Sequence, residues 1–452
     1  MAVPANRRDF CRRAAALAGA GLLPAGVASL ARAQAAPHVA PITMVINQSP
    51  WFDGFRQLVE QYQKESGNRI ELDVNPYAGA LDKIRNSLRA GSGSYDLLAI
   101  DNNWMVEMFD GGFLTPLTDL DPAFKLDAQV SSYGGTVFWN DKLHTFDPNG
   151  GKLMGVPING NVEVFFYRRD LYEQKGLKVP ETWDQALENA TKLNDGSKVY
   201  GFVHRDDRDS ALADFSNYLF SFGGDIFANA SAGDFSIVLN SPAARRALEF
   251  YLRLGKAGGY PSPGSVSQGQ MIQLMATGKA AQTVGIVGAW SQLEDPNKSA
   301  VVGRIEAALI PRGEGGAHAS RAGHWIGAIA RNVPRDKQAA ALQFLRWFQT
   351  LDHQLAYTRY GAVPVRVDLG SSDLARDPRF RFLKAQAENS RVARMYAVVP
   401  EAAQMSSILS LRLNECIIGK ASVVDTLNRA AAEMQDLMAR SGRKTGRLPD
   451  LK

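Results

Sequence analysis

One stretch, residues 151–177, restricts the fold of this chain more than any other. An apolar run from Leu153 to Ile158 is interrupted by Asn161 and Glu163 before Val164–Tyr167 resumes it. A buried strand must satisfy such polar groups, because an unpaired buried polar group costs about 1–3 kcal/mol. We therefore expect this segment to cross between two lobes and to offer polar groups to a ligand between them.

Strand alternation separates the candidates within this crossing. Asn161 and Glu163 are two residues apart, so their side chains share one face of an extended strand and one cleft can use both. Asn159 follows Pro157 closely and is equally suited to a turn. The pattern favours Asn161 and Glu163 as ligand contacts.

The length of the chain indicates more than one core. With 452 residues, 45% apolar and 21% charged, the chain is typical of a globular protein with two or three domains' worth of structure. We find no low-complexity linker and no internal repeat. Two lobes joined by several crossings fit this pattern better than separate domains on a string.

The first 35 residues have the pattern of an export signal. Asn6–Phe10 carries twin arginines, Ala14–Ala31 is weakly apolar, and Ala33–Ala35 fits the small-x-small cleavage rule. An anchor helix is the alternative, and Pro24 with several glycines disfavours it. We predict a cleaved twin-arginine signal peptide and a periplasmic protein.

Charge and cysteine content exclude several classes of function. The arginines of residues 1–35, less Asp9, account for +4 of the net charge of +5, which leaves +1 for the rest. A nearly neutral domain offers no electrostatic footprint for nucleic acid. Cys416 is the single cysteine after the signal, so neither an internal disulfide nor a cysteine metal site is expected.

Three short apolar runs predict an α/β lobe. Ile42–Ile46, Ile70–Val74 and Leu97–Ile100 alternate with helical patterns, which indicates a largely parallel sheet. In such sheets ligands bind at the carboxyl ends of the strands. Each predicted strand end is followed by polar residues and an aromatic. We expect these clusters to line a site.

Motifs for catalysis and for cofactors are missing from the sequence. No HExxH, CxxC, GxxxxGK[ST] or GxSxG pattern occurs, and the six histidines lack ligand spacing. We expect no cofactor and no metal. The charged segment 204–209 is interpreted as a solvated surface turn. Trp183 and Trp347 lie within helical patterns and are expected in the core.

What remains is a set of aromatic and polar residues at loop positions. Planar polar side chains both donate to and accept from hydroxyl groups, and flat aromatics cover the apolar face of a sugar ring. Each loop tryptophan is about equally suited to capping a core, and Asp101 to capping a helix. The candidate ligand contacts are Asn47, Trp51, Asp101, Asn103, Trp104, Asn161, Glu163, Asp225, Trp290, His324, Trp325 and Arg366.

Several short motifs between Ile42 and Arg366 occur in a familiar order. They include Gly151–Pro157, Phe166–Leu171, Gly278–Ala281, Gly288–Trp290 and Gly361–Arg366. Each is weak alone, but their order and spacing together are specific. The chain resembles the bacterial extracellular solute-binding proteins of ABC importers, family 1, which includes maltose-binding protein.

The resemblance implies an α/β, two-lobe periplasmic-binding-protein fold with a ligand cleft between lobes joined by hinge crossings. The implied lobes are 38–158 with 284–333 and 159–283 with 334–452. Hinge motion closes such lobes on a solute, and the closed monomer docks on permease subunits. Two features depart from the family. Gln282 replaces an apolar residue, and the insertion-like segment 118–149 can reshape one rim of the cleft.

The leading interpretation is a binding protein, not an enzyme, for a sugar, oligosaccharide or polyol. A second is a phosphorylated or carboxylated solute, which Arg366 or His324 would pair with. From another class, a secreted carbohydrate-active enzyme can use the same aromatics with two unidentified carboxylates. A twin-arginine signal also admits a folded redox enzyme, although no cofactor motif supports one.

Overall fold

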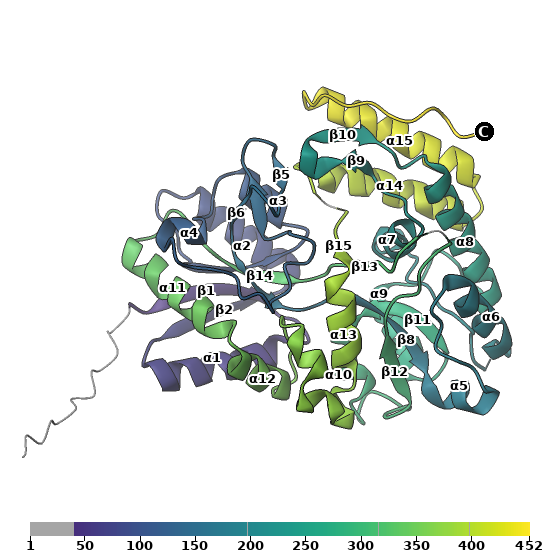
Figure 1. Ribbon diagram of the computed structural model, residues 1–452, viewed down its shortest axis with the longest axis horizontal. Coiled ribbons are helices and arrows are strands. Elements are labelled where there is room, and N and C mark those ends of the chain that lie inside the picture. The colour runs from purple at the N-terminus through teal and green to yellow at the C-terminus, as the bar shows by residue number, and fades with distance from the viewer. Residues whose placement is uncertain (1–39, 197, 315, 397) are drawn as a thin grey trace, which may run out of the picture. The chain divides into compact units, whose positions relative to one another are not determined.

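The computed structural model describes residues 40–452, except residues 197, 315 and 397. The predicted signal peptide over residues 1–35 therefore lies outside the described residues. The described part belongs to one compact unit, organised around a five-stranded sheet and the antiparallel sheet β11-β8-β12, with three further small sheets (Figure 1). We call the elements around the five-stranded sheet the first lobe and those around the largest antiparallel sheet the second lobe.

The first lobe contains the predicted parallel strands. β1 (Ile42–Asn47) lies between β2 (Ile70–Asn75) and β3 (Leu97–Asp101), and all three run parallel. β14 (Trp325–Ile329) pairs antiparallel with β3, and β7 (Val156–Asn159) completes the order β2-β1-β3-β14-β7. The predicted α/β alternation is confirmed. The helices between and after these strands are α1 (Phe52–Ser66), α2 (Tyr77–Arg89), α3 (Met105–Asp110), α4 (Leu117–Leu120), α11 (Arg335–Phe348) and α12 (Leu351–Arg359).

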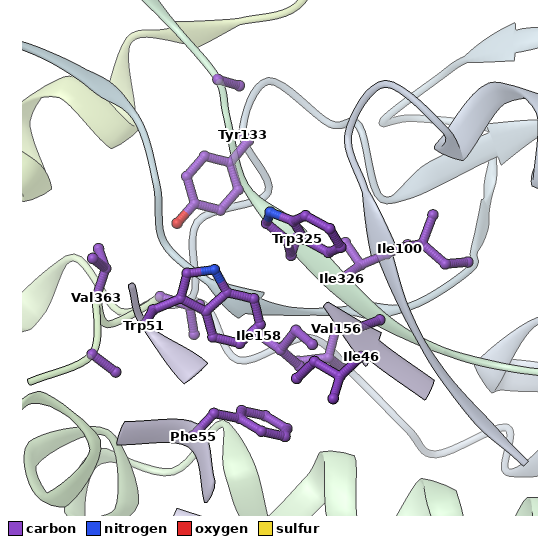
Figure 2. Packing of buried hydrophobic residues seen from close by; sticks show 14 of the residues in the cluster. Ile46, Trp51, Phe55, Ile100, Tyr133, Val156, Ile158, Trp325, Ile326 and Val363 are labelled. Carbon is purple, nitrogen blue, oxygen red and sulfur yellow. The ribbon is translucent and has the colours of Figure 1, made fainter. Parts of the chain in front are cut away.

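The apolar periodicity of α1 determines which of its faces is buried. Phe55, Leu58 and Tyr62 recur at helical spacing and are all buried. The helix ends at Gly67, whose left-handed backbone (φ 72°) lets its N–H bond to Gln63 O. Figure 2 shows the resulting core, with Phe55 below the sheet residues and the rings of two tryptophans beside them.

The second lobe is built on an antiparallel sheet with the order β11-β8-β12. β8 (Glu163–Arg168) is central, with β11 (Gln282–Ile286) and β12 (Ile305–Ala308) on either side. Successive side chains of β8 point to opposite faces of the sheet, so Phe165 packs in one hydrophobic core and Phe166 in the other. The surrounding elements are α5 (Arg169–Lys175), α6 (Trp183–Leu193), α7 (Ala211–Ser221), β9 (Phe227–Asn229), β10 (Asp234–Ile237), α8 (Pro242–Gly258), α9 (Gln268–Ala276), α10 (Trp290–Leu293) and α13 (Phe382–Arg391).

The C-terminal helices complete the second lobe. α14 (Ala402–Ile417) packs on α7, and α15 (Val423–Arg440) packs on α14 and α8, as the yellow helices of Figure 1 show. Five one-turn 3₁₀ helices lie at 230–232, 287–289, 368–371, 373–376 and 378–380. Among the described residues, no helix combines the length and apolar character that a membrane span requires.

Sheet membership corrects the predicted lobe boundaries at two segments. Residues 284–333 were assigned to the first lobe, but β11 pairs with β8 along its whole length and β12 pairs with β8 on the other side. Residues 334–452 were assigned to the second lobe, but α11 contacts β1 and β14, and α12 contacts α1. The chain therefore returns to the first lobe at 321–325 and leaves it again after α12.

The two segments that depart from the family pattern have ordinary structural roles. Gln282 is fully buried, where it accepts from the Tyr172 hydroxyl at 2.5 Å and donates to Gly201 O at 3.0 Å. The strand that carries it keeps regular pairing with β8. Segment 118–149 adds β4 (Phe138–Asn140) and β5 (Thr145–Phe146), which form a small sheet with β6 (Lys152–Leu153).

The crossings between the lobes lie against one another. Val162 and Ala322 form an isolated antiparallel bridge, and Gly323 N–H donates to Asn161 O at 3.0 Å. Gly160 N–H donates to Val363 O at 3.1 Å, which joins the first crossing to a third segment of chain. Backbone contacts this close leave little room for side chains.

Gly160 gives a direct test of this close packing. A Cβ atom at this position would stand 1.7 Å from Pro364 O. Gly160→Ala is expected to lower the free energy of unfolding by about 1–3 kcal/mol, because backbone must shift to admit the methyl group. Urea unfolding measures the loss. Gly91→Ala, where a Cβ meets nothing within 4 Å, is the control. Equal effects of the two substitutions would contradict the tight crossing.

Candidate functional site

A cavity of about 360 Å³ lies at the carboxyl ends of β1, β2 and β3. The first lobe contributes Ser49, Pro50, Trp51, Tyr77, Asp101, Asn102, Asn103 and Trp325. The second lobe contributes Arg205, Asp209, Ser210, Ala213, Gln268, Ile286 and Gly288, and the connecting segments contribute Asn161, Arg321, Gly323 and Tyr396. Both lobes and their crossings therefore surround one cavity, at the sheet edge where the sequence placed it.

One wall of the cavity is aromatic. Trp325 lies at the start of β14, and its ring is 6.0 Å from that of Trp51 and 5.2 Å from that of Trp104. Tyr77 lies 4.5 Å from Trp104 and is 46% exposed, whereas each of these three tryptophans is 5% exposed. Trp104 therefore supports the wall from behind, while Trp51, Tyr77 and Trp325 line it.

Asp101 supplies a hydrogen-bond acceptor beside this wall. Its Oδ1 accepts from the backbone and side-chain nitrogens of Asn103, at 2.9 and 2.7 Å, and from the Tyr77 hydroxyl at 3.1 Å. Its Oδ2 has no hydrogen-bond partner among the described residues, which leaves this atom for a bound molecule. Burial raises the pKa of Asp101, and hydrogen bonds from Asn103 and the charge of Arg321 oppose that shift.

Asn161 comes from the first crossing. Its carboxamide oxygen accepts from the backbone N–H of Gly288 at 2.9 Å. That bond fixes the orientation of the amide and leaves its NH₂ group to donate into the cavity. The polar interruption of the strand thus reaches the cavity at Asn161.

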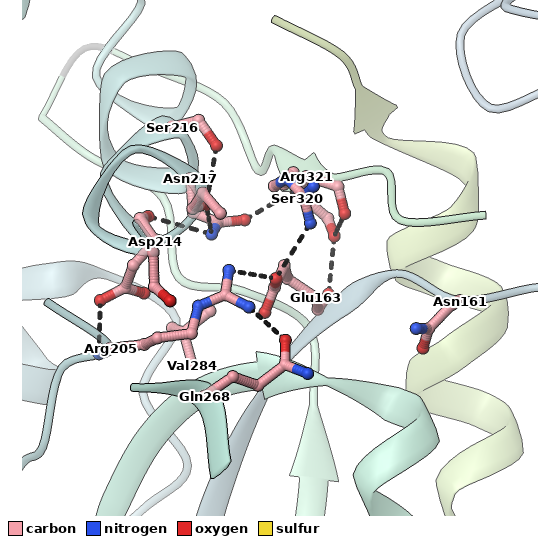
Figure 3. A network of polar contacts seen from close by, with 12 residues as sticks. Asn161, Glu163, Arg205, Asp214, Ser216, Asn217, Gln268, Val284, Ser320 and Arg321 are labelled. Carbon is pink, nitrogen blue, oxygen red and sulfur yellow. Dashed lines mark hydrogen bonds and ion pairs between the residues drawn. The ribbon is translucent and has the colours of Figure 1, made fainter. Parts of the chain in front are cut away.

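Glu163 lies behind the cavity, where it holds two arginines. Its Oε1 accepts from Arg205 Nη2 at 2.9 Å and lies 3.5 Å from Arg321 Nη1 (Figure 3). The Glu163 side chain is 1% exposed and is not part of the cavity wall. The partners that its buried carboxylate requires are these protein side chains. The sequence-based expectation that Glu163 faces the cleft is corrected on this point.

The arginines themselves were missed by sequence reasoning. Segment 204–209 was interpreted as a solvated turn, but His204, Arg205 and Asp206 are all buried. His204 bonds to Asp214 Oδ2 at 3.0 Å, and Arg205 N–H donates to the same oxygen at 3.1 Å. Charged residues are most often exposed, and the charged partner of the Arg205 guanidinium, Glu163, lies 42 residues earlier in the sequence. The sequence did indicate that the carboxylate of Glu163 needs a partner, and this was the one signal that could have pointed to buried arginines.

Other missed lining residues come from one predicted strand end and from two segments that the sequence analysis did not locate. Tyr77 follows β2, and Gln268 begins α9 behind the cap Ser267. Arg321 begins the return crossing, and its guanidinium lies over the ring of Tyr396, with Cζ 5.5 Å from the ring centroid. Asp101 and Asn103 were predicted because they lie at the end of the third predicted strand. The same argument, applied to the end of the second strand, would have predicted Tyr77.

Three predicted contacts lie in other parts of the molecule. Trp290 donates from Nε1 to Arg379 O at 3.0 Å and packs on Phe382, away from the cavity. The Arg366 guanidinium pairs with Asp127 and Asp368, and Asp225 pairs with Arg394. In each case the polar or charged group of the side chain is already bonded to other residues of the chain. These residues are corrected to structural roles.

Asn47 and His324 are buried beside the cavity without lining it. Asn47 ends β1, is 4% exposed and donates to Gln48 O at 3.4 Å. His324 is fully buried, stacks on Tyr133 at 4.2 Å and shares a 3.0 Å hydrogen bond with Thr136 Oγ1. Burial and then the charge of Arg321 lower the pKa of His324 to about 3. The residue is neutral at pH 7 and offers no charge to an acid.

The lowered pKa of His324 predicts acid sensitivity. An unfolded histidine titrates near pH 6.5 and folded His324 near pH 3, so its contribution to stability is complete above pH 6.5 and is lost as the pH falls. The loss is about 1.4 kcal/mol per pH unit, or about 2 kcal/mol between pH 7.5 and 5. Urea unfolding at both pH values should show a smaller change for His324→Gln than for wild type. Identical changes would contradict the neutral buried histidine.

The polar side chains of the cavity do not form a cluster of metal-ligand type among the described residues. Within the described ranges, no group of three or more His, Cys, Asp or Glu side chains is placed to hold a metal ion. The arrangement of the cavity instead combines aromatic faces with both donors and acceptors of hydrogen bonds. Such a site binds a molecule through shape and hydrogen bonds.

Comparisons with known proteins identify the family of this chain. The family described as bacterial extracellular solute-binding protein matches residues 47–354, more than half of the chain. A probable amino-acid ABC transporter periplasmic-binding protein of Sinorhizobium fredii is 22% identical, over 88% of this chain and 88% of its own length.

Solved structures share the fold. A maltose-bound protein of T. maritima has a TM-score of 0.72 at 22% identity and covers 88% of this chain and 100% of its own. An ABC transporter solute-binding protein of Agrobacterium radiobacter, in complex with ribitol, has a TM-score of 0.70 at 25% identity, covering 88% and 99%. The chain belongs to the bacterial extracellular solute-binding protein family.

Proposed function

We propose that the chain captures a neutral sugar, oligosaccharide or polyol in this cavity and delivers it to the permease subunits of an ABC importer. The observation that carries the proposal is the composition of the wall. Trp325 and Tyr77 offer aromatic faces, Asp101 an acceptor, and Asn161 with Arg321 donors. Polyhydroxyl solutes need all three, because each hydroxyl both donates and accepts and each ring has an apolar face.

The charge of the site supports a neutral solute over an acidic one. Arg366 and His324, the residues expected to pair with an acid, lie outside the cavity wall. Arg205 and Arg321 do line it, but Glu163 already engages both. The ribitol and maltose of the compared structures also favour a neutral solute. The amino-acid name of one relative makes amino acids a necessary member of any ligand screen.

Capture would proceed by closure of the two lobes about their crossings. The cavity takes residues from both lobes, and the crossings at 159–163 and 321–325 lie side by side. Neighbouring short connections of this kind are suited to a hinge. The twin arginines of residues 7 and 8 support export through the twin-arginine route to the periplasm, where a monomer would meet its permease.

Tryptophan emission offers a test of the proposed function. Trp51, Trp104 and Trp325 lie in one cluster at the cavity, so a bound solute should alter their emission. We expect saturable binding by at least one neutral sugar or polyol, and weak or no binding of amino acids and sugar phosphates. Tight binding of an amino acid alone would overturn the proposal, and release of a hydrolysis product would favour the enzyme alternative.

A further inference from the structure

The two cavity arginines are held by neighbouring groups, of which Glu163 and Asn217 lie behind the cavity wall and Gln268 lines it. Arg205 donates from Nη2 to Glu163 and from Nη1 to Gln268 Oε1, at 2.9 and 2.5 Å. The backbone N–H of Arg321 donates to Asn217 Oδ1 at 2.7 Å, and its Nη1 lies 3.5 Å from Glu163 (Figure 3). Their guanidinium groups can therefore move little when a solute binds.

Hydrogen bonding in this network is incomplete. Both arginines approach the same oxygen of Glu163, while Glu163 Oε2 and the Nε atoms of both arginines are buried without partners among the described residues. Arg205 is 4% exposed and Arg321 is 7% exposed, yet both line the cavity. One carboxylate thus serves two guanidinium groups that line the cavity, and the Nε donors of both are enclosed without a partner among the described residues.

The positive charges of the two guanidinium groups are nearly balanced by the acidic side chains around them. Glu163 offsets one of the two arginines from behind, and Asp101 and Asp209 line the same cavity from the other sides. A solute carboxylate would place one more negative charge among these three acids. Without Glu163, two buried guanidinium groups would face the cavity, and guanidinium pairs with carboxylates through forked hydrogen bonds.

We propose that Glu163 is the specificity-determining residue that keeps acidic solutes out of the cavity and so restricts it to neutral polyhydroxyl compounds. Glu163 touches no solute and acts through Arg205 and Arg321. The inference rests on the proposed function and adds to it the chemical class that the site rejects.

Matched pairs of neutral and acidic ligands test this role. The probes are galactose with galacturonate, maltose with maltobionate, and ribitol with ribonate, each titrated calorimetrically at low and high salt. Wild-type protein is expected to bind the neutral member of its best pair at least about tenfold more tightly. In Glu163→Gln this preference should fall at least about tenfold, with the gain in acid binding screened by salt.

Two variants show whether charge in the cavity causes the change. Glu249→Gln on α8 removes one negative charge from an exposed ion pair with Arg245 and should leave the preference unchanged. Arg205→Gln should strengthen the preference for the neutral ligand, opposite to Glu163→Gln. If Glu163→Gln shows no cooperative thermal transition and is therefore not folded, Arg205→Gln still tests the role of charge in the cavity.

The possible results distinguish a failure of this inference from a failure of the proposed function. A preference that does not change in Glu163→Gln, or that shifts equally in Glu249→Gln, overturns the role of Glu163 and leaves sugar binding intact. Wild-type protein that binds the acidic members as tightly as the neutral ones overturns it as well. Wild-type protein that binds no probe overturns the proposed function, and this inference with it.

Discussion

Replacing Asp101 with asparagine is expected to weaken solute binding about 10- to 150-fold, since a hydrogen bond to a charged group contributes about 1.5–3 kcal/mol. Asp101 Oδ1 is engaged by Asn103 and Tyr77, so Oδ2 is the atom that accepts from a solute hydroxyl. Asparagine keeps an oxygen for the internal bonds and replaces the outer acceptor with an NH₂ donor. Calorimetric titration with the best neutral ligand measures the loss.

The same substitution should leave folding intact. Burial raises the pKa of Asp101, so a neutral amide avoids the cost of holding a buried charge and the melting temperature should stay constant or rise. Asp209→Asn is the matched control, because Asp209 lines the cavity but is exposed. We expect it to change affinity by less than about threefold, since solvent weakens its interactions. Equal losses in the two variants would show that Asp101 is not the principal acceptor.

Trp290→Ala is expected to lower the free energy of unfolding by about 3–5 kcal/mol, the usual cost of emptying a buried tryptophan site. Trp290 is 5% exposed, its ring centroid lies 5.5 Å from that of Phe382, and the Arg381 guanidinium lies over it at 4.5 Å. Because none of these contacts borders the solute cavity, affinity should change by less than about threefold. Urea unfolding and solute titration of the same variant measure both quantities.

Trp290→Phe separates the ring from its hydrogen bond. Phenylalanine keeps most of the packing and loses the bond from Nε1 to Arg379 O, so it should cost clearly less than alanine. The sequence-based hypothesis made Trp290 a ligand contact, which would weaken binding at unchanged stability. A variant that melts like wild type but binds solute poorly would restore that hypothesis.

The fold could be predicted largely from local patterns. Ile42–Ile46, Ile70–Val74 and Leu97–Ile100 are short apolar runs between amphipathic helices, and each became a parallel strand of the first sheet. Lobe membership after residue 283 could not be predicted in the same way, because β11 and α11 are each compatible with either sheet. Pairing of β11 with β8, which lies more than a hundred residues earlier, decides the matter.

The site was predictable where it follows strand ends. Trp51, Asp101, Asn103, Asn161 and Trp325 line the cavity. Trp51, Asp101 and Asn103 were chosen because the carboxyl ends of parallel strands converge. Asn161 was chosen because it interrupts the apolar crossing, and Trp325 because it is a tryptophan at a loop position. Residues with strong internal partners could not be recognised. His324, for example, stacks on Tyr133, and nothing near it in the sequence indicates that contact.

The buried arginines show that burial of a charged residue could not be predicted from the residue and its sequence neighbours alone. Arg205 looks solvated beside its charged neighbours, and its burial is explained by the bonds of its guanidinium to Glu163 and Gln268. The sequence did show that Glu163 needed a partner, but the choice between a ligand and a protein side chain depends on three-dimensional contacts.

A crystal structure of the protein with its tightest neutral ligand tests the central claim most directly. We predict the solute in the cavity at the ends of β1, β2 and β3, with its ring or chain against Trp325 and a hydroxyl group within hydrogen-bond distance of Asp101 Oδ2. A solute bound in another cavity, or one that contacts neither Trp325 nor Asp101, would contradict the account.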